Sequence, residues 1–86
     1  MSGEKRLREL LGRLRERLSQ SRSVDADSRD HLSAVVTDID GDLGRGGAAS
    51  AHAPRLESLA VRFEADHPGL AEVIREVIDA LVRGGV

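Results

Sequence analysis

Three aspartates spaced two residues apart are the first candidates for chemistry in this 86-residue chain. The segment Asp38-x-Asp40-x-Asp42 matches the start of an EF-hand loop, in which carboxylates at alternate positions ligate calcium. The complete loop also needs Gly at its sixth position and Glu at its twelfth, where this chain has Leu43 and Ala49. Because both diagnostic positions fail, we interpret the aspartates as the acidic end of a helix and predict no metal.

The histidines are the second candidates. Asp27 and His31 are four residues apart, a spacing that allows two metal ligands on one helical face, but no third ligand lies nearby in the sequence. His67 beside Asp66 would need a nucleophile or substrate pocket to act as a general base, so we interpret this pair as helix capping. An enzyme would require an oligomeric site built from histidines and aspartates. We predict no catalytic residue, no cofactor and no enzymatic activity.

Apolar residues recur in the first half of the chain with the periodicity of two amphipathic helices. Leucines at steps of four, three and four predict a first helix over residues 2–19: Leu7, Leu11, Leu14 and Leu18. The same spacing predicts a second helix over residues 26–43: Leu32, Val36, Ile39 and Leu43. Such stripes form the narrow seam of a coiled-coil-like contact. Because only a short polar turn separates the two helices, we expect an antiparallel hairpin.

The second half of the chain is predicted to contain a flexible loop and two shorter helices. Residues 44–53 are rich in Gly and Ala and lack apolar periodicity, which is typical of a loop. Pro54 suits the first turn of a helix over residues 54–66, and Pro68 suits the start of a helix over residues 68–83. Pro68 also disfavours helical geometry at the preceding residue, so two separate helices and one kinked helix both remain open. The predicted fold is an all-α helical bundle.

Charge is unevenly divided between the two helices of the hairpin. Residues 1–22 carry seven basic and three acidic side chains, a net of +4, whereas residues 23–43 carry one basic and six acidic side chains, a net of −5. Charges that border an apolar seam select the partner helix and its orientation. The predicted inter-helix pairs join two arginines to three aspartates: Arg6 and Arg8 with Asp38, Asp40 and Asp42.

The last helix carries apolar side chains over much more than one face. The set comprises Leu70, Val73, Ile74, Val77, Ile78, Leu81 and Val82. A helix with so wide an apolar face has to be covered on more than one side, so it is either the central helix of the monomer or part of a subunit interface. Because a chain of this length builds only a small core, we predict self-association through these side chains, with a dimer favoured.

The segment from Phe63 to Leu70 reads Phe-Glu-Ala-Asp-His-Pro-Gly-Leu. Together with the opening Leu7-x-x-Leu10-Leu11 and the acidic second helix, it resembles a bacterial family of short helical proteins that is classed as a domain of unknown function. The resemblance covers almost the whole chain, and its specific part is the Phe-Glu-x-x-His-Pro-x-Leu core. It implies an all-helical cytoplasmic protein and brings no activity, cofactor or site residue with it.

Composition narrows the remaining classes of function. A net charge of −2 and a single aromatic residue, Phe63, argue against nucleic-acid binding by charge attraction or base stacking. No apolar run is long enough to span a membrane and no secretory signal is apparent, so we expect a cytoplasmic location. We predict one domain over residues 1–86, a non-catalytic interaction or scaffolding module for copies of itself or an unidentified protein partner. The alternative is a nucleic-acid-associated or membrane-surface regulator that uses the arginines of the first helix: Arg6, Arg8, Arg13, Arg15 and Arg17.

Overall fold

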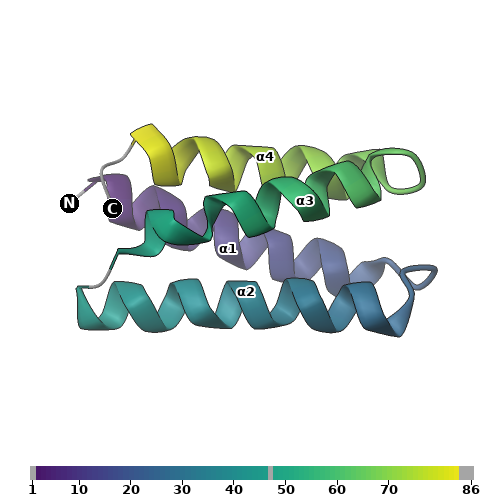
Figure 1. Cartoon of the computed structure of the whole chain (residues 1–86), viewed down its shortest axis with the longest axis horizontal. Helices are drawn as coiled ribbons and strands as arrows, with labels where there is room; N and C mark the ends of the chain where they lie inside the picture. The colour runs from purple at the N-terminus through teal and green to yellow at the C-terminus, as the bar shows by residue number, and fades with distance from the viewer. Residues whose placement is uncertain (1, 47, 84–86) are drawn as a thin grey trace.

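The structure is a computed structural model that describes residues 2–46 and 48–83. Its described residues form a bundle of four antiparallel α-helices. The helices are α1 (Ser2–Gln20), α2 (Ala26–Arg45), α3 (Ala53–Glu64) and α4 (Pro68–Arg83), and the short 3-10 helix η1 (Ala49–His52) leads directly into α3. They run alternately up and down along the long axis, in a bundle measuring 35 × 20 × 19 Å (Figure 1). The prediction of an all-α helical bundle is confirmed.

The four helices occupy the corners of the bundle in chain order. α1 lies against α2 and α4, and α3 lies against the same two helices, while the diagonal pairs do not approach each other. The closest backbone approach is between α3 and α4. Two small buried side chains explain it, because Ala60 of α3 and Ala71 of α4 let the backbones come together. α2 approaches its neighbours less closely than α4 does.

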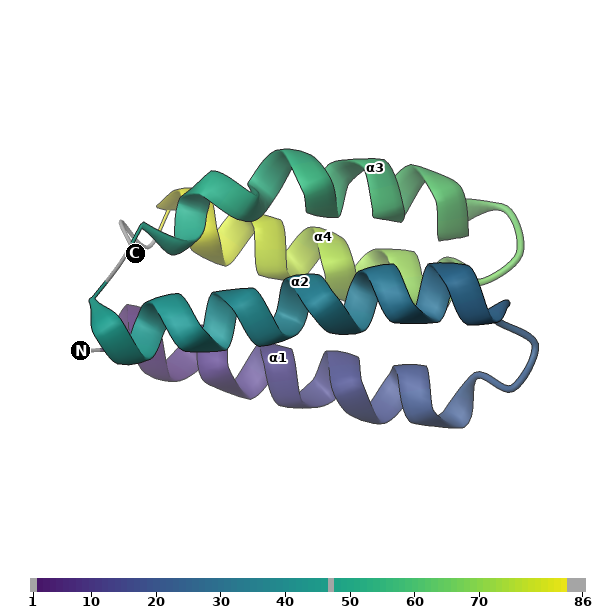
Figure 2. The ribbon, with the colours of Figure 1, turned by 60° about the horizontal axis from the view of Figure 1, so that its bottom comes forward.

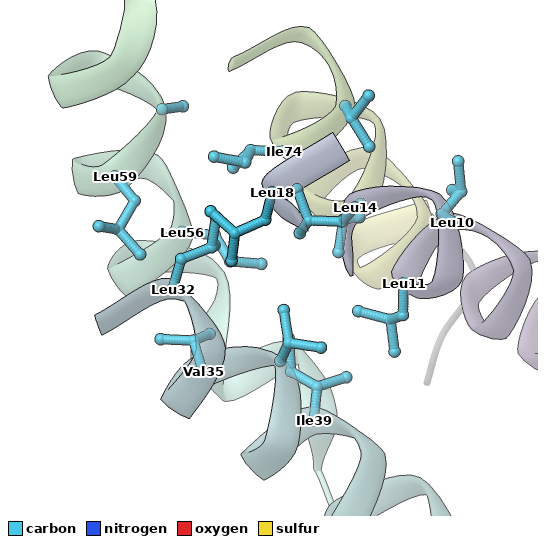
Figure 3. Packing of buried hydrophobic residues seen from close by; sticks show 14 of the residues in the cluster. Leu10, Leu11, Leu14, Leu18, Leu32, Val35, Ile39, Leu56, Leu59 and Ile74 are labelled. Carbon is cyan, nitrogen blue, oxygen red and sulfur yellow. The ribbon is translucent and has the colours of Figure 1, made fainter. Parts of the chain in front are cut away.

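One connected core runs through the bundle. The leucine stripe of α1 is buried as predicted, and side chains from the other three helices meet it (Figure 3). Those labelled in the close view come from every helix: Leu10, Leu11, Leu14 and Leu18 of α1, Leu32, Val35 and Ile39 of α2, Leu56 and Leu59 of α3, and Ile74 of α4. The apolar periodicity of the sequence therefore assigned the inward faces of α1 and α2 correctly.

Local interactions fix both ends of α2. The carboxylate of Asp25 accepts a hydrogen bond from the Ser28 N–H over 3.0 Å, which satisfies one of the free donors of the first turn. At the other end, Gly46 adopts the left-handed conformation, with φ of 70°, and its N–H turns back to carbonyls of the last turn. A residue with a Cβ is disfavoured in that conformation, so Gly46 sets where the helix ends.

The chain reverses direction between α3 and α4, which are two separate helices (Figure 2). His67 holds both helix ends through its backbone. Its N–H donates to the Phe63 carbonyl over 2.7 Å, and its own carbonyl accepts from the N–H groups of Leu70 and Ala71. Pro68, which has no N–H to donate, occupies the first position of α4. Of the two arrangements that the sequence left open, separate helices are the one observed.

The predicted loop over residues 44–53 contains more helix than the sequence indicates. Gly44 and Arg45 belong to the last turn of α2, and η1 follows from Ala49. The Ala49 side chain is fully buried, so this segment packs against the core. Alanine favours helical turns because it loses no side-chain entropy and offers no polar group that competes with the backbone. Residue 47 of the predicted loop lies outside the described residues.

Candidate interaction surface

The apolar side chains that were predicted to form a subunit interface are mostly covered within the monomer. Five of the seven are buried: Leu70, Val73, Ile74, Val77 and Leu81. α4 lies between α1 and α3, and these two neighbours cover its apolar face from two sides. The five buried side chains are therefore not available to a second chain, because neighbours within the monomer already cover them. Only Ile78, which is partly buried, and Val82, which is exposed, remain of the predicted interface.

Among the residues that the structure describes, two large apolar side chains are exposed, one on α3 and one on α4. Val61 of α3 and Val82 of α4 are each 65% exposed. A shallow hollow of about 380 Å³ between the two helices is lined by Glu57, Ala60, Val61, Arg75 and Ile78. We define the α3–α4 surface as four of these lining residues together with Glu64, which pairs with Arg75, and Val82, which lies one helical turn after Ile78: Glu57, Val61, Glu64, Arg75, Ile78 and Val82. Here apolar side chains lie next to charged ones, a composition suited to binding another protein surface.

Val61 is the residue of this surface that the sequence analysis missed. The inward face of α3 is formed by Leu56, Leu59, Ala60 and Phe63, and all four are buried. Val61 lies off that stripe, on the side of the helix that the periodicity assigns to solvent. A large β-branched side chain at such a position was the available signal. It indicates either a chance exposure or a contact outside the monomer.

A groove on the opposite side of α3 separates this helix from α2. Its volume is about 240 Å³, and its lining contains basic, hydroxyl and apolar side chains: His31, Val35, Arg55, Ser58, Leu59 and Arg62. Arg55 donates to the carboxylate of Asp38 over 3.2 Å, whereas Arg62 donates to the hydroxyl of Ser28 over 3.3 Å. No carboxylate among the described residues lies within 4.0 Å of the Arg62 guanidinium.

The arginines of α1 do not form the predicted pairs with α2. Arg8 pairs with Glu4, one turn earlier on α1, at 3.5 Å. Arg6 instead faces α4, where it lines a hollow with several acidic side chains. Arg15 is the α1 residue that pairs with Asp40. A helical side chain leans toward the N-terminus of its own helix, so Arg15 reaches back along α1 toward the C-terminal half of α2.

The aspartates of α2 find partners elsewhere. Asp38 pairs with Arg55 of α3, at 3.2 Å. Asp42 accepts from Arg45 and lies 2.7 Å from Nε2 of His52. The hydrogen bond from His52 is the main cause that holds the pKa of Asp42 below its ordinary value of 3.8, and the bond from Arg45 adds to it. The acidic end of α2 therefore holds η1 and α3 in place.

The ring of His52 has a defined role in this contact. Nη1 of Arg55 lies 3.3 Å from Nδ1 of His52, and a guanidinium only donates hydrogen bonds. Nδ1 therefore accepts, and Nε2 carries the proton that is donated to Asp42. His52 thus connects the end of α2 to the start of α3 by two polar contacts.

The other end of α2 is attached to α1 by one side chain. Nη1 and Nη2 of Arg29 donate to the carbonyls of Leu18 and Ser21, over 2.8 and 2.6 Å. The same two carbonyls also accept from the backbone N–H groups of Ser21 and Val24 in the turn that follows α1. Nearby, the hydrogen bond from the Ser28 N–H is the main cause that lowers the pKa of Asp25 below 3.8. Arg29 and Asp25 therefore have structural roles at the junction between α1 and α2.

The remaining histidines also make local contacts. Nδ1 of His31 lies 3.9 Å from a carboxylate oxygen of Asp27, and both side chains are exposed. The ring of His67 meets Phe63 edge-on, with centroids 6.0 Å apart. Across residues 2–46 and 48–83, no group of three or more His, Cys, Asp or Glu side chains is placed to hold a metal ion. The α3–α4 surface and the α2–α3 groove are therefore the candidate sites.

Comparison with known proteins supports the resemblance seen in the sequence. None of the described helices has the length and apolar character needed to cross a membrane. No curated protein and no solved structure matches the chain. A family model described as Domain of unknown function (DUF4404) matches residues 7–86, which include most of α1 and all of the other described helices. The chain therefore belongs to the DUF4404 family of unknown function.

Proposed function

We propose that this chain is a non-catalytic helical interaction module that self-associates through the α3–α4 surface, in the cytoplasm. The observation that carries the proposal is the exposure of Val61 and Val82, with the partly buried Ile78 on the same surface. Contact sites combine a small apolar centre with a polar rim. The α3–α4 surface has both parts.

The charges around this surface support a second copy as its partner. Glu57 and Glu64 lie along α3, and Arg75 lies across from them on α4, where it pairs with Glu64 at 3.0 Å. A surface that carries both signs of charge is able to meet a copy of itself without repulsion. The apolar part is small, and stable complexes bury about 1,200 Å² or more. We therefore expect a weak dimer in which neighbouring polar side chains contribute area.

The alternative function, in which the arginines of α1 bind nucleic acid or a membrane surface, has less support. Three of the five arginines already pair with acidic side chains: Arg8 with Glu4, Arg13 with Glu76 and Arg15 with Asp40. Binding of phosphate groups would have to compete with these internal partners. The pairs leave α1 with less free positive charge than its sequence indicates.

The proposal is tested by the mass of the protein in solution. Sedimentation velocity over a hundredfold range of concentration should show a monomer that becomes a dimer. Val61→Asp places a charge in the proposed apolar centre and should leave only monomer, while circular dichroism stays unchanged. Thr37→Asp adds the same charge at an exposed position on the α1 side of α2, so it serves as the control and should still dimerise. A wild-type monomer at all concentrations would refute the proposal.

A further inference from the structure

The outer face of α3 carries a second stripe with the spacing of a helix-helix seam. Its members follow each other at steps of four, three and four: Pro54, Ser58, Val61 and Ala65. All four are exposed, and Ala65 continues the helical backbone conformation with φ of −73° and ψ of −46°. Steps of this kind correspond to the a and d positions of a coiled coil. With three small or short side chains and one valine, the stripe allows a close approach between two helices.

Charges of opposite sign border the two sides of this stripe. On the side of α2 lie Arg55 and Arg62, which line the α2–α3 groove. On the side of α4 lie Glu57 and Glu64, of which Glu57 lines the α3–α4 hollow and Glu64 pairs with Arg75. In heptad terms the arginines occupy e positions and the glutamates occupy g positions. Side chains at e and g choose the partner and its orientation.

Two of these four charges lack an ion-pair partner in the monomer. Arg55 pairs with Asp38 and Glu64 with Arg75, whereas Glu57 and Arg62 pair with no charged group within 4.0 Å in the part of the chain that the structure describes. They are five residues apart, with the glutamate first. In a parallel coiled coil, a g side chain meets the e side chain five residues further along the other helix, because the helices lie side by side in register.

From this pattern we infer that α3 pairs in parallel with α3 of a second copy, so that Glu57 of each copy meets Arg62 of the partner subunit. The inference rests on the proposed function, since it specifies how the self-association is built. An antiparallel pair would place e beside e and g beside g, which brings like charges together. The twofold axis then runs along α3, and the ion pair forms twice.

The same arrangement uses the two candidate sites together. A twofold axis along α3 places α2 of one copy opposite α4 of the other. The Arg62 side of the groove therefore faces the α3–α4 surface of the second copy on the side where Glu57 lies. Each site lacks part of the ion pair, because the groove supplies Arg62 and the α3–α4 surface supplies Glu57. The dimer accounts for both sites with one contact.

Charge reversal with rescue is the experiment that tests this pairing. Glu57→Arg and Arg62→Glu should each weaken the dimer about tenfold, since two favourable pairs become two repulsive ones. The double variant restores opposite charges and should return the dissociation constant to within about threefold of wild type. Glu16→Arg, an exposed reversal on α1 at the diagonal corner, is the matched control and should have no effect. Circular dichroism checks that every variant folds.

The outcomes separate this inference from the proposed function. If the single reversals have no effect while Val61→Asp still abolishes the dimer, self-association stands and the parallel pairing is refuted. Loss in both single variants without rescue in the double variant also refutes the pairing.

Because the chain contains no cysteine, Ala65→Cys adds an independent measurement. In a parallel pair, residue 65 meets its equivalent, so oxidation should give a disulfide-linked dimer. In an antiparallel pair it meets the other end of α3, and no link should form.

Discussion

α4 and α2 occupy diagonal corners of the bundle and are held by different kinds of interaction. α4 lies close to α1 and α3 and buries a wide apolar face that includes Val73 and Val77. α2 is set further from both of its neighbours, and grooves run along its two sides. Polar side chains at its ends connect it to its neighbours, since Arg29 contacts α1 and Asp42 contacts η1.

This difference shows that the apolar pattern of a helix predicts which face is buried but not how tightly that face is packed. The position of α4 depends on volume filled between two close neighbours, so any loss of volume leaves a cavity. α2 also buries apolar side chains, but it is set further from its neighbours, and its position depends in addition on directed hydrogen bonds at its ends. The two helices should therefore respond differently to the same kind of substitution, and the following predictions use that contrast.

The largest effect is expected from a matched pair of valine truncations. Val77 of α4 and Val36 of α2 are both buried. Val77→Ala should lower the free energy of unfolding by about 2–3 kcal/mol, and Val36→Ala by about 1 kcal/mol, because a loosely seated helix is able to shift and fill part of the cavity. Urea unfolding of the two variants measures both values. Equal losses would show that α2 is packed as tightly as α4 and would remove the contrast.

The next effect tests the polar attachment of α2. Arg29→Ala removes both donors to the carbonyls of Leu18 and Ser21 at the end of α1. The expected loss is about 1–2 kcal/mol, because hydrogen bonds from charged groups are stronger than neutral ones. Arg22→Ala, in the neighbouring turn and exposed, is the control and should change stability by less than about 0.5 kcal/mol. If Arg29→Ala were as stable as this control, apolar contacts alone would hold α2 in position.

Two glycines at the end of α2 should give effects of opposite sign. Gly44 is helical, and a Cβ added there meets no atom within 4 Å, so Gly44→Ala should stabilise the protein by up to about 1 kcal/mol. Gly46 has a φ of 70°, so Gly46→Ala should destabilise it by about 1 kcal/mol. Thermal unfolding of the two variants compares them directly. A gain in both would contradict the left-handed helix end.

The smallest effect is expected in the dependence of thermal stability on pH. The pKa values of Asp25 and Asp42 are lowered in the folded protein, so each carboxylate stabilises the fold at pH values above its ordinary pKa of 3.8. That contribution is lost as the pH falls through the lowered pKa. Thermal unfolding at pH 6 and pH 3 should show a smaller drop in the Asp25→Asn/Asp42→Asn variant than in wild type. Asp30→Asn, at an exposed position of α2, should keep the wild-type drop.

The sequence was sufficient for the helices and their inward faces, because apolar spacing reports directly on burial. All four helices were predicted with ends within two residues of those observed. The predicted ion pairs of Arg6 and Arg8 were not found, for two reasons. Arg6 lies on the side of α1 that faces α4, and Arg8 pairs with Glu4 within α1. In addition, a helical projection neglects the lean of a long side chain along the helix axis. That lean is what brings Arg15, and not Arg8, to Asp40.

The candidate surface was harder to predict for a related reason. Periodicity identifies the wide apolar face of α4 but does not tell whether a neighbour within the chain or a second copy covers it. The burial of Ile74 and Val77 by α1 and α3 depends on distances between helices, which Ala60 and Ala71 set by their small size. Val61, in contrast, could have been identified from the sequence as a large apolar side chain on the solvent side of α3, but the sequence does not tell whether a second chain contacts it.

The close contact between α3 and α4 also bears on how quickly the chain finds its fold. The two helices are joined by three residues and pack more closely than any other pair of described helices. Their contacts therefore join residues that are near in sequence, and closing the connecting loop costs little conformational entropy. We expect this hairpin to be formed in the folding transition state and α2 to dock after it. Substitutions at Val77 should then slow refolding, whereas those at Val36 should mainly speed unfolding.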